Sequence, residues 1–271
     1  MLQFPTHDNA DIGSRRMSDG LLPGKLSHIG AKVFRSIEHL KTLDQQITVF
    51  LESKPYEVVA EFDAQERTYI YRVKIQRDVP LGIRVLTGEV LGQLRSALDH
   101  LAWQLALLNG PIPAESTEFP IFRDESPYRS QRVRKIGSLP AAAQVIIDGL
   151  QPYLSVAPED DRLWVLHRLA NDDKHRLPHL VGVAPSGITA GDRRGRDMAV
   201  EIRIGPFDEQ TIIGRVIFTN PAETDVEVQT DIRFDLAFPA DSAAKGNMVR
   251  PELVRCGQRV EEVVRKFETF F

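Results

Sequence analysis

Residues 81–108 read LGIRVLTGEVLGQLRSALDHLAWQLALL, and this stretch decides the fold. Its apolar residues recur at spacings of three and four over more than one stripe, which predicts a long helix that is buried on several sides. Asn109, Gly110 and Pro111 follow directly, and residues of these types end helices. We therefore expect the rest of the chain to pack around this central helix.

Helices and one hairpin are predicted on both sides of it. Apolar residues every three or four positions predict an amphipathic helix over residues 27–53. Two runs rich in β-branched and aromatic residues, 56–62 and 68–75, predict a hairpin. Shorter helices are expected over residues 141–150 and 160–176.

The C-terminal part alternates in the manner of strands. Four such runs between residues 177 and 238 predict an antiparallel meander, and Pro251 suits the first turn of a closing helix. The predicted fold class is α+β: a helical core interrupted by a β-hairpin, followed by an antiparallel β-meander and a C-terminal helix. We expect a flexible leader over residues 1–25, a helical region with the inserted hairpin over 26–180, and the meander and closing helix, packed on the helical region, over 181–271.

Composition and charge narrow the classes of function. The 271 residues are 42% hydrophobic and 27% charged, which is typical of a globular protein. The net charge of -4 comes from 34 basic and 38 acidic residues spread evenly, so no broad positive field indicates a nucleic-acid partner. The sequence has no phosphate loop, dinucleotide fingerprint or Gly-x-Ser-x-Gly elbow, and we expect no cofactor.

Location is predicted from two features. Cys256 is the only cysteine, which excludes an intramolecular disulfide and fits a reducing compartment, and its apolar helix predicts core packing. No apolar run approaches the roughly 20 residues that a membrane span requires. We therefore expect a cytoplasmic protein without a membrane partner.

Three ionisable residues interrupt the apolar surface of the central helix: Arg95, Asp99 and His100. A buried charge must be paired, or it costs folding free energy. Arg95 and Asp99 stand four positions apart and can form an ion pair on one helix face. His100 is five positions from Arg95, which at about 100° per residue places the two side chains roughly 140° apart. A joint site therefore needs a bend or a second helix.

A second polar cluster, Asn171-Asp-Asp-Lys-His-Arg176, ends the helix predicted over residues 160–176. His167, Asn171 and His175 are spaced by four and can line one face, with Lys174 beside them. Such a stripe is ordinarily a solvated surface. If this helix instead packs against the central one, the two clusters would form one pocket with imidazoles for proton transfer near neutral pH.

At this point the sequence resembles known families. The Arg95-x-x-x-x-His100 arrangement resembles the Arg-x(4 to 6)-His signature of HEPN-type helical domains, many of which are metal-independent ribonucleases of defence and toxin systems. Over about residues 30–180 the chain also resembles an uncharacterised family of actinobacterial proteins. Four stretches carry that likeness: GEVLGQLRSALDHLAWQLALLNG, TEFPIF, LQPY and NDDKHRL. The HEPN signature usually has Asn or Asp directly after the arginine, where this chain has Ser96, and here a hairpin interrupts the helices.

The HEPN resemblance implies a metal-independent endoribonuclease. His100 would act as general base or acid on a ribose 2'-hydroxyl, and Arg95 would stabilise charge on the phosphate, which leaves a 2',3'-cyclic phosphate. Such sites are commonly composite across a symmetric dimer, so RNA and a second copy of the chain are the implied partners. The implied supporting or RNA-phosphate-binding residues are Ser96, Asp99, Asn171, Lys174 and His175.

The same residues also fit a non-enzymatic interaction or regulatory protein. In that interpretation they form a buried polar network that fixes how two helices cross, and a protein partner binds the meander or the Trp103 region. The absence of a basic surface favours this interpretation. The sequence leaves both hypotheses open.

A metal site is a weaker alternative. His167, His175 and His179, with Asp172 or Asp173, are the candidate ligands, but Pro178 interrupts the helical spacing of the last two histidines. We therefore expect no metal.

Other conspicuous residues have ordinary interpretations. Trp103 and Trp164 are expected to anchor the core. The basic segment 129–135 is expected to be solvated, and it is the best candidate for contact with an RNA backbone.

Overall fold

The computed structural model describes residues 27–66, 68–110, 112–186, 198–202, 205–218 and 233–271. The predicted leader, residues 1–25, lies outside the described residues. The chain divides into two compact units that are interleaved along the sequence. The first comprises residues up to 42, 86–177 and 252–271, and the second comprises 43–85 and 178–251. The fold class is α+β, as predicted.

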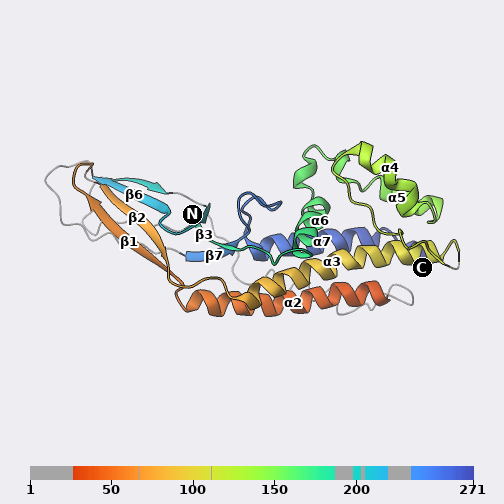
Figure 1. Cartoon of the computed structure of the whole chain (residues 1–271), viewed down its shortest axis with the longest axis horizontal. Helices are drawn as coiled ribbons and strands as arrows, with labels where there is room; N and C mark the ends of the chain where they lie inside the picture. Colours follow the sequence, from red (N-terminus) through yellow and green to blue (C-terminus); the bar gives the residue numbers. More distant parts are fainter. Residues whose placement is uncertain (1–26, 67, 111, 187–197, 203–204, 219–232) are drawn as a thin grey trace. The chain divides into compact units, whose positions relative to one another are not determined.

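The central helix α3 (Leu81–Leu107) contributes more buried apolar residues to the first unit than any other element. Helix α2 (Ser27–Glu52) meets it where His39 Nδ1 lies 2.9 Å from Glu89 Oε2. Helix α7 (Val249–Arg265) meets it where Gly257 faces Leu94. Figure 1 shows the three helices side by side. Several leucines of α3 are 0–1% exposed, among them Leu91, Leu94, Leu98, Leu101 and Leu105.

Helix α6 (Arg162–Asp173) packs on both α7 and α3. Arg162 Nη1 lies 3.2 Å from Glu252 Oε1 of α7, and Glu252 is fully buried. At the other end of α6, a Cβ placed on Gly88 of α3 would lie 2.2 Å from Asp173 Oδ1, so any larger residue at this crossing would require the Asp173 carboxylate to move. The packing of α6 on the central helix, which the pocket hypothesis required, is therefore present. Cys256 is fully buried, as its apolar helix predicted.

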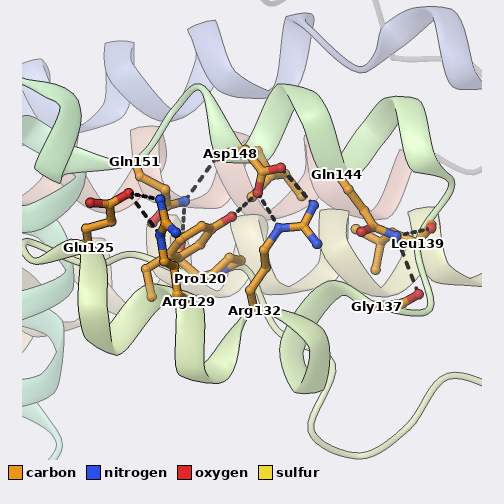
Figure 2. Close-up of polar contacts among 11 residues, drawn as sticks. Pro120, Glu125, Arg129, Arg132, Gly137, Leu139, Gln144, Asp148 and Gln151 are labelled. Carbon is orange, nitrogen blue, oxygen red and sulfur yellow. Dashed lines mark hydrogen bonds and ion pairs between the residues drawn. The ribbon is translucent and has the colours of Figure 1, made fainter.

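A helical pair, α4 (Glu125–Ile136) and α5 (Ala141–Asp148), completes the first unit. The sequence analysis did not predict α4. Only Tyr128, Lys135 and Ile136 of α4 are buried, so this helix lacks the apolar stripe from which periodicity identifies a helix. Two 2.7 Å hydrogen bonds from Arg132 to the Asp148 carboxylate join the pair (Figure 2).

The second unit contains two antiparallel sheets. One has the order β1 (Tyr56–Asp63), β2 (Thr68–Ile75), β6 (Ile212–Phe218) and β4 (Met198–Ile202). The other has the order β5 (Gly205–Phe207), β3 (Val181–Ser186) and β7 (Arg233–Ala237).

The hairpin is confirmed, and β2 pairs with β6, so the hairpin shares a sheet with the later strands. These later strands are antiparallel, as predicted, but they pair in interleaved order instead of following one another as in a simple meander. Aromatic packing supports the arrangement, since the Tyr56 ring lies edge-on to Phe207 and Phe234 at 5.0 and 5.3 Å. No helix in the described part of the chain has both the length and the apolar character that a bilayer crossing requires.

Candidate functional site

The site begins with an ion pair on α3 that holds a loop. Arg95 Nη1 lies 3.0 Å from Asp99 Oδ1, as the spacing of four predicted. Arg95 Nη2 also donates to the carbonyl of Phe119 at 2.8 Å, and the Phe119 N–H donates to Asp99 Oδ1 at 3.1 Å. The pair therefore binds both backbone groups of one residue in the segment Phe119–Phe122. Because Arg95 is 7% exposed, this contact is largely screened from water.

The opposite side of the same segment is held by Gln151, which follows α5 and is 3% exposed. Its side-chain nitrogen donates to the Pro120 carbonyl at 2.9 Å (Figure 2). Its oxygen accepts from the Phe122 N–H at 3.2 Å. The Tyr153 N–H donates to the Phe122 carbonyl at 3.2 Å. Side chains and backbone thus fix the loop from α3 and from the end of α5, so it forms a stiff wall.

This wall borders a cavity of about 360 Å³ within the first unit. The lining residues come from α3, the wall, α4 and α6. They are Arg95, Glu118, Phe119, Ile121, Phe122, Arg123, Asp124, Pro127, Gln131, Lys135, Trp164 and His167. Three of these residues are basic, two are acidic and three are Phe or Trp.

The buried charge of the cavity is mainly positive. The Arg95 and Lys135 side chains are 8% and 10% exposed, whereas their partners Asp99 and Glu118 are 36% and 45% exposed. Burial lowers the pKa of Lys135, and the neighbouring Arg95 lowers it further. Burial raises the pKa of Asp99, an effect that Arg95 and the Phe119 N–H oppose. The cations are therefore less hydrated than the carboxylates that pair with them.

His167 of α6 is held as a neutral ring with a defined tautomer. Lys174 Nζ donates to Asn171 Oδ1 at 3.2 Å, which turns the amide nitrogen of Asn171 toward His167 Nε2 at 3.0 Å. Nε2 therefore accepts, and the ring carries its proton on Nδ1. Burial, together with four nearby cations, lowers the pKa of His167 to about 4. Nδ1 is buried and has no hydrogen-bond partner within the described residues.

Trp164 and Lys135 differ from their predicted environments. Trp164 is half-buried and lines the cavity instead of anchoring the core, and the Arg123 guanidinium lies 5.8 Å from its ring centre. Trp103 is 37% exposed, so the prediction of core burial is also wrong there. Lys135 is buried although the segment 129–135 was expected to be solvated, because the last turn of α4 faces the cavity.

The structure brings together only part of the predicted catalytic set. Arg95 and Asp99 lie in the network, and Asn171 and Lys174 are connected to the cavity through His167. His100 is exposed on α3, and Ser96 is half-buried. His175 is exposed and lies beyond the end of α6.

Sequence reasoning missed the cavity role of Lys135, Trp164 and His167, and the clamp by Gln151. The available signal was the position of Gln151 and the wall in the quoted stretches LQPY and TEFPIF. For the metal alternative, no group of three or more His, Cys, Asp or Glu residues in the described ranges could hold an ion.

We compared the chain with family models, with curated proteins and with solved structures, and none of them matches.

Proposed function

We propose that the chain is a non-enzymatic recognition protein that binds a small ligand in the Arg95 cavity. The observation that carries this proposal is the two-sided clamp on Phe119–Phe122. Hydrogen bonds from Arg95 and Asp99 on one side, and from Gln151 on the other, fix the wall before any ligand arrives. A preformed wall reduces the entropy that binding must overcome.

The size and lining of the cavity support the same proposal. Small-molecule sites are concave, mostly apolar and about 300–1,000 Å³ in volume, with a few polar groups that fix orientation. The volume here, about 360 Å³, falls in that range. Aromatic side chains and two buried cations supply the apolar surface and the orienting groups.

A blocked cavity tests the proposal. Gln131→Trp places a large ring in the lining, and Ser130→Trp places the same ring at the neighbouring exposed position of α4, outside the lining. Thermal unfolding of the wild type is screened against small metabolites. A ligand at 100 times its dissociation constant should stabilise the protein by about 2.7 kcal/mol, or roughly 5 °C in Tm at this chain length.

We expect that shift in the wild type and in Ser130→Trp but not in Gln131→Trp. Equal shifts in both tryptophan variants, or no shift with any compound, would contradict the proposal.

A HEPN-like, metal-independent endoribonuclease is the second candidate. It is favoured by the exposed His100, which lies one and a half turns after an arginine that lines an open cavity. His100 would take the proton of a ribose 2'-hydroxyl, whose oxygen attacks phosphorus and displaces the 5'-oxygen. Arg95 would stabilise the charge, with Ser96, Asp99, Asn171, Lys174 and His175 in support.

The placement of these two side chains makes a homodimer part of that candidate. Since Arg95 is buried and His100 points to solvent, a second copy would have to supply one of the two groups. The test is cleavage of cellular RNA in chelator by the wild type, His100→Ala and Arg95→Ala, each shown to be folded by circular dichroism. Loss of 2',3'-cyclic phosphate ends in both variants would support it, and absence of cleavage by the wild type would exclude it.

A further inference from the structure

Two buried nitrogen donors of the cavity residues make no aligned hydrogen bond within the described residues. Arg95 Nη1 is paired with Asp99 by distance but donates no aligned hydrogen bond, and His167 Nδ1–H has no partner, within the described ranges. A buried donor that stays unsatisfied costs about 1–3 kcal/mol. Both donors belong to residues that line the same cavity. Because both nitrogens are buried, a ligand oxygen would offset that cost only after a small shift of the two side chains.

The charges around the cavity limit how negative such a ligand can be. Three ion pairs are already closed: Arg95 with Asp99, Lys135 with Glu118, and Arg123 with Asp124. Lys174 contacts the neutral Asn171 and has no carboxylate partner in the described part of the chain. The lining and its partners are therefore about neutral, and the surplus of about one positive charge comes from Lys174, which is exposed and lies outside the lining. One carboxylate would match it, whereas a phosphate ester would add negative charge beside Glu118 and Asp124.

Three of the remaining lining residues carry flat aromatic rings. Phe119, Phe122 and Trp164 contribute rings, Arg123 lies over the Trp164 ring and Lys135 Nζ lies 5.8 Å from the centre of the Phe122 ring. Rings and guanidinium planes stack on planar groups. A volume of about 360 Å³ equals that of on the order of ten water molecules, which suits a compound of one or two rings.

We propose that the ligand of this cavity is a planar aromatic compound with a single carboxylate, held by Arg95 and Lys135 at its charged end and by Trp164 and Phe122 along its ring. This inference rests on the recognition function proposed above and specifies the class of ligand.

Isothermal titration calorimetry of the full chain with three probes tests it. The probes are 2-naphthoate, its neutral analogue 2-naphthamide, and cyclohexanecarboxylate, an anion without a flat ring. Hydrogen bonds to charged groups contribute about 1.5–3 kcal/mol, so 2-naphthoate should bind roughly 10- to 100-fold more tightly than the amide. Cyclohexanecarboxylate should also bind more weakly, because it cannot stack.

Variants locate the binding. Lys135→Met and Trp164→Leu should each weaken 2-naphthoate binding at least tenfold. Arg134→Met, which removes the adjacent exposed cation of α4 outside the lining, should leave it unchanged. Lys135→Met keeps the test interpretable if Arg95→Met fails to fold, because the hydrogen bonds that fix the wall backbone come from Arg95, Asp99 and Gln151.

Absence of 2-naphthoate binding, or equal affinity for acid and amide, would overturn the inference about ligand class. If a neutral compound or a nucleotide instead stabilised the wild type but not Gln131→Trp, the proposed recognition function would stand, and only the inference about the class of ligand would fail. If no compound of the screen stabilised the wild type, both would fail.

Discussion

The buried imidazole of His167 should make the stability of this protein depend on pH. The ring lies beside Arg95 of α3, Lys135 of α4, and Arg168 and Lys174 on or just after α6, and burial together with these charges lowers its pKa from 6.5 to about 4. His167→Gln removes the ionisable ring and keeps a side-chain amide that can meet Asn171. The wild type should therefore lose stability in acid relative to this variant.

The magnitude follows from the shift in pKa. Above pH 6.5 the imidazole is neutral in both the folded and the unfolded state, so its protonation does not lower the free energy of unfolding. As pH falls from 6.5 toward 4, the unfolded chain takes up the proton before the folded protein does, and stability is lost. One pKa unit corresponds to about 1.4 kcal/mol, so the total loss is about 3 kcal/mol, of which about 2.5 kcal/mol has occurred at pH 4.5.

Urea unfolding followed by tryptophan fluorescence at pH 7.5, 6.5, 5.5 and 4.5 measures the effect. The difference in unfolding free energy between wild type and His167→Gln removes the contributions of all other titrating groups. His100→Gln is the matched control, because that histidine is exposed and lies outside the cavity lining. A wild-type minus His167→Gln difference that stayed constant from pH 7.5 to 4.5 would refute the buried, neutral imidazole.

Two further pairs of variants test the wall and the helix crossing. Gln151→Leu should lower the free energy of unfolding in chemical denaturation by about 2–3 kcal/mol, because it leaves the Phe122 N–H and the Pro120 carbonyl without partners. Gln144→Leu removes a more exposed amide of α5 and should lower it by under about 1 kcal/mol. Equal losses would show that the wall is not specially held. Gly92→Ala should raise stability by about 0.5–1 kcal/mol, because open space surrounds that position of α3 and alanine favours the helix. Gly88→Ala should give no gain or a loss in the same measurement, since its methyl group meets the Asp173 carboxylate; an equal gain at both sites would contradict the close approach of α6.

Periodicity predicted those elements that have a broad apolar face. Helices α2, α3, α5, α6 and α7, and the hairpin, occur near their predicted bounds because buried leucines, valines and isoleucines repeat at helical or strand spacing. Helix α4 was missed because its residues are mostly charged and only its Tyr128 side and its last turn are buried. The order of the strands in the sheets could not be predicted either. Alternation of apolar and polar residues identifies a strand, but the choice of its neighbours depends on tertiary packing.

The candidate site was predictable where one helix determines the geometry. The spacing of four between Arg95 and Asp99 predicted their ion pair. The angle of about 140° between Arg95 and His100 around the helix axis predicted that the two side chains face different surroundings. The partners Phe119 and Gln151 could not be derived, because a buried side chain that binds backbone groups of a distant loop leaves no periodic pattern. His167 was considered as part of a polar stripe and as a candidate metal ligand, and neither interpretation anticipated that it lines the cavity.

Contacts in the structure join the four stretches of sequence that carried the resemblance. GEVLGQLRSALDHLAWQLALLNG supplies Arg95 and Asp99, TEFPIF supplies the wall, LQPY supplies Gln151, and NDDKHRL begins with the asparagine that sets the tautomer of His167. A catalytic pair alone would not require the second and third stretches, because neither contributes a group that transfers a proton to His100. A cavity with a stiff wall requires all four. The arrangement of contacts therefore supports the proposed recognition of a ligand, in which Arg95 would serve both the wall and the bound charge.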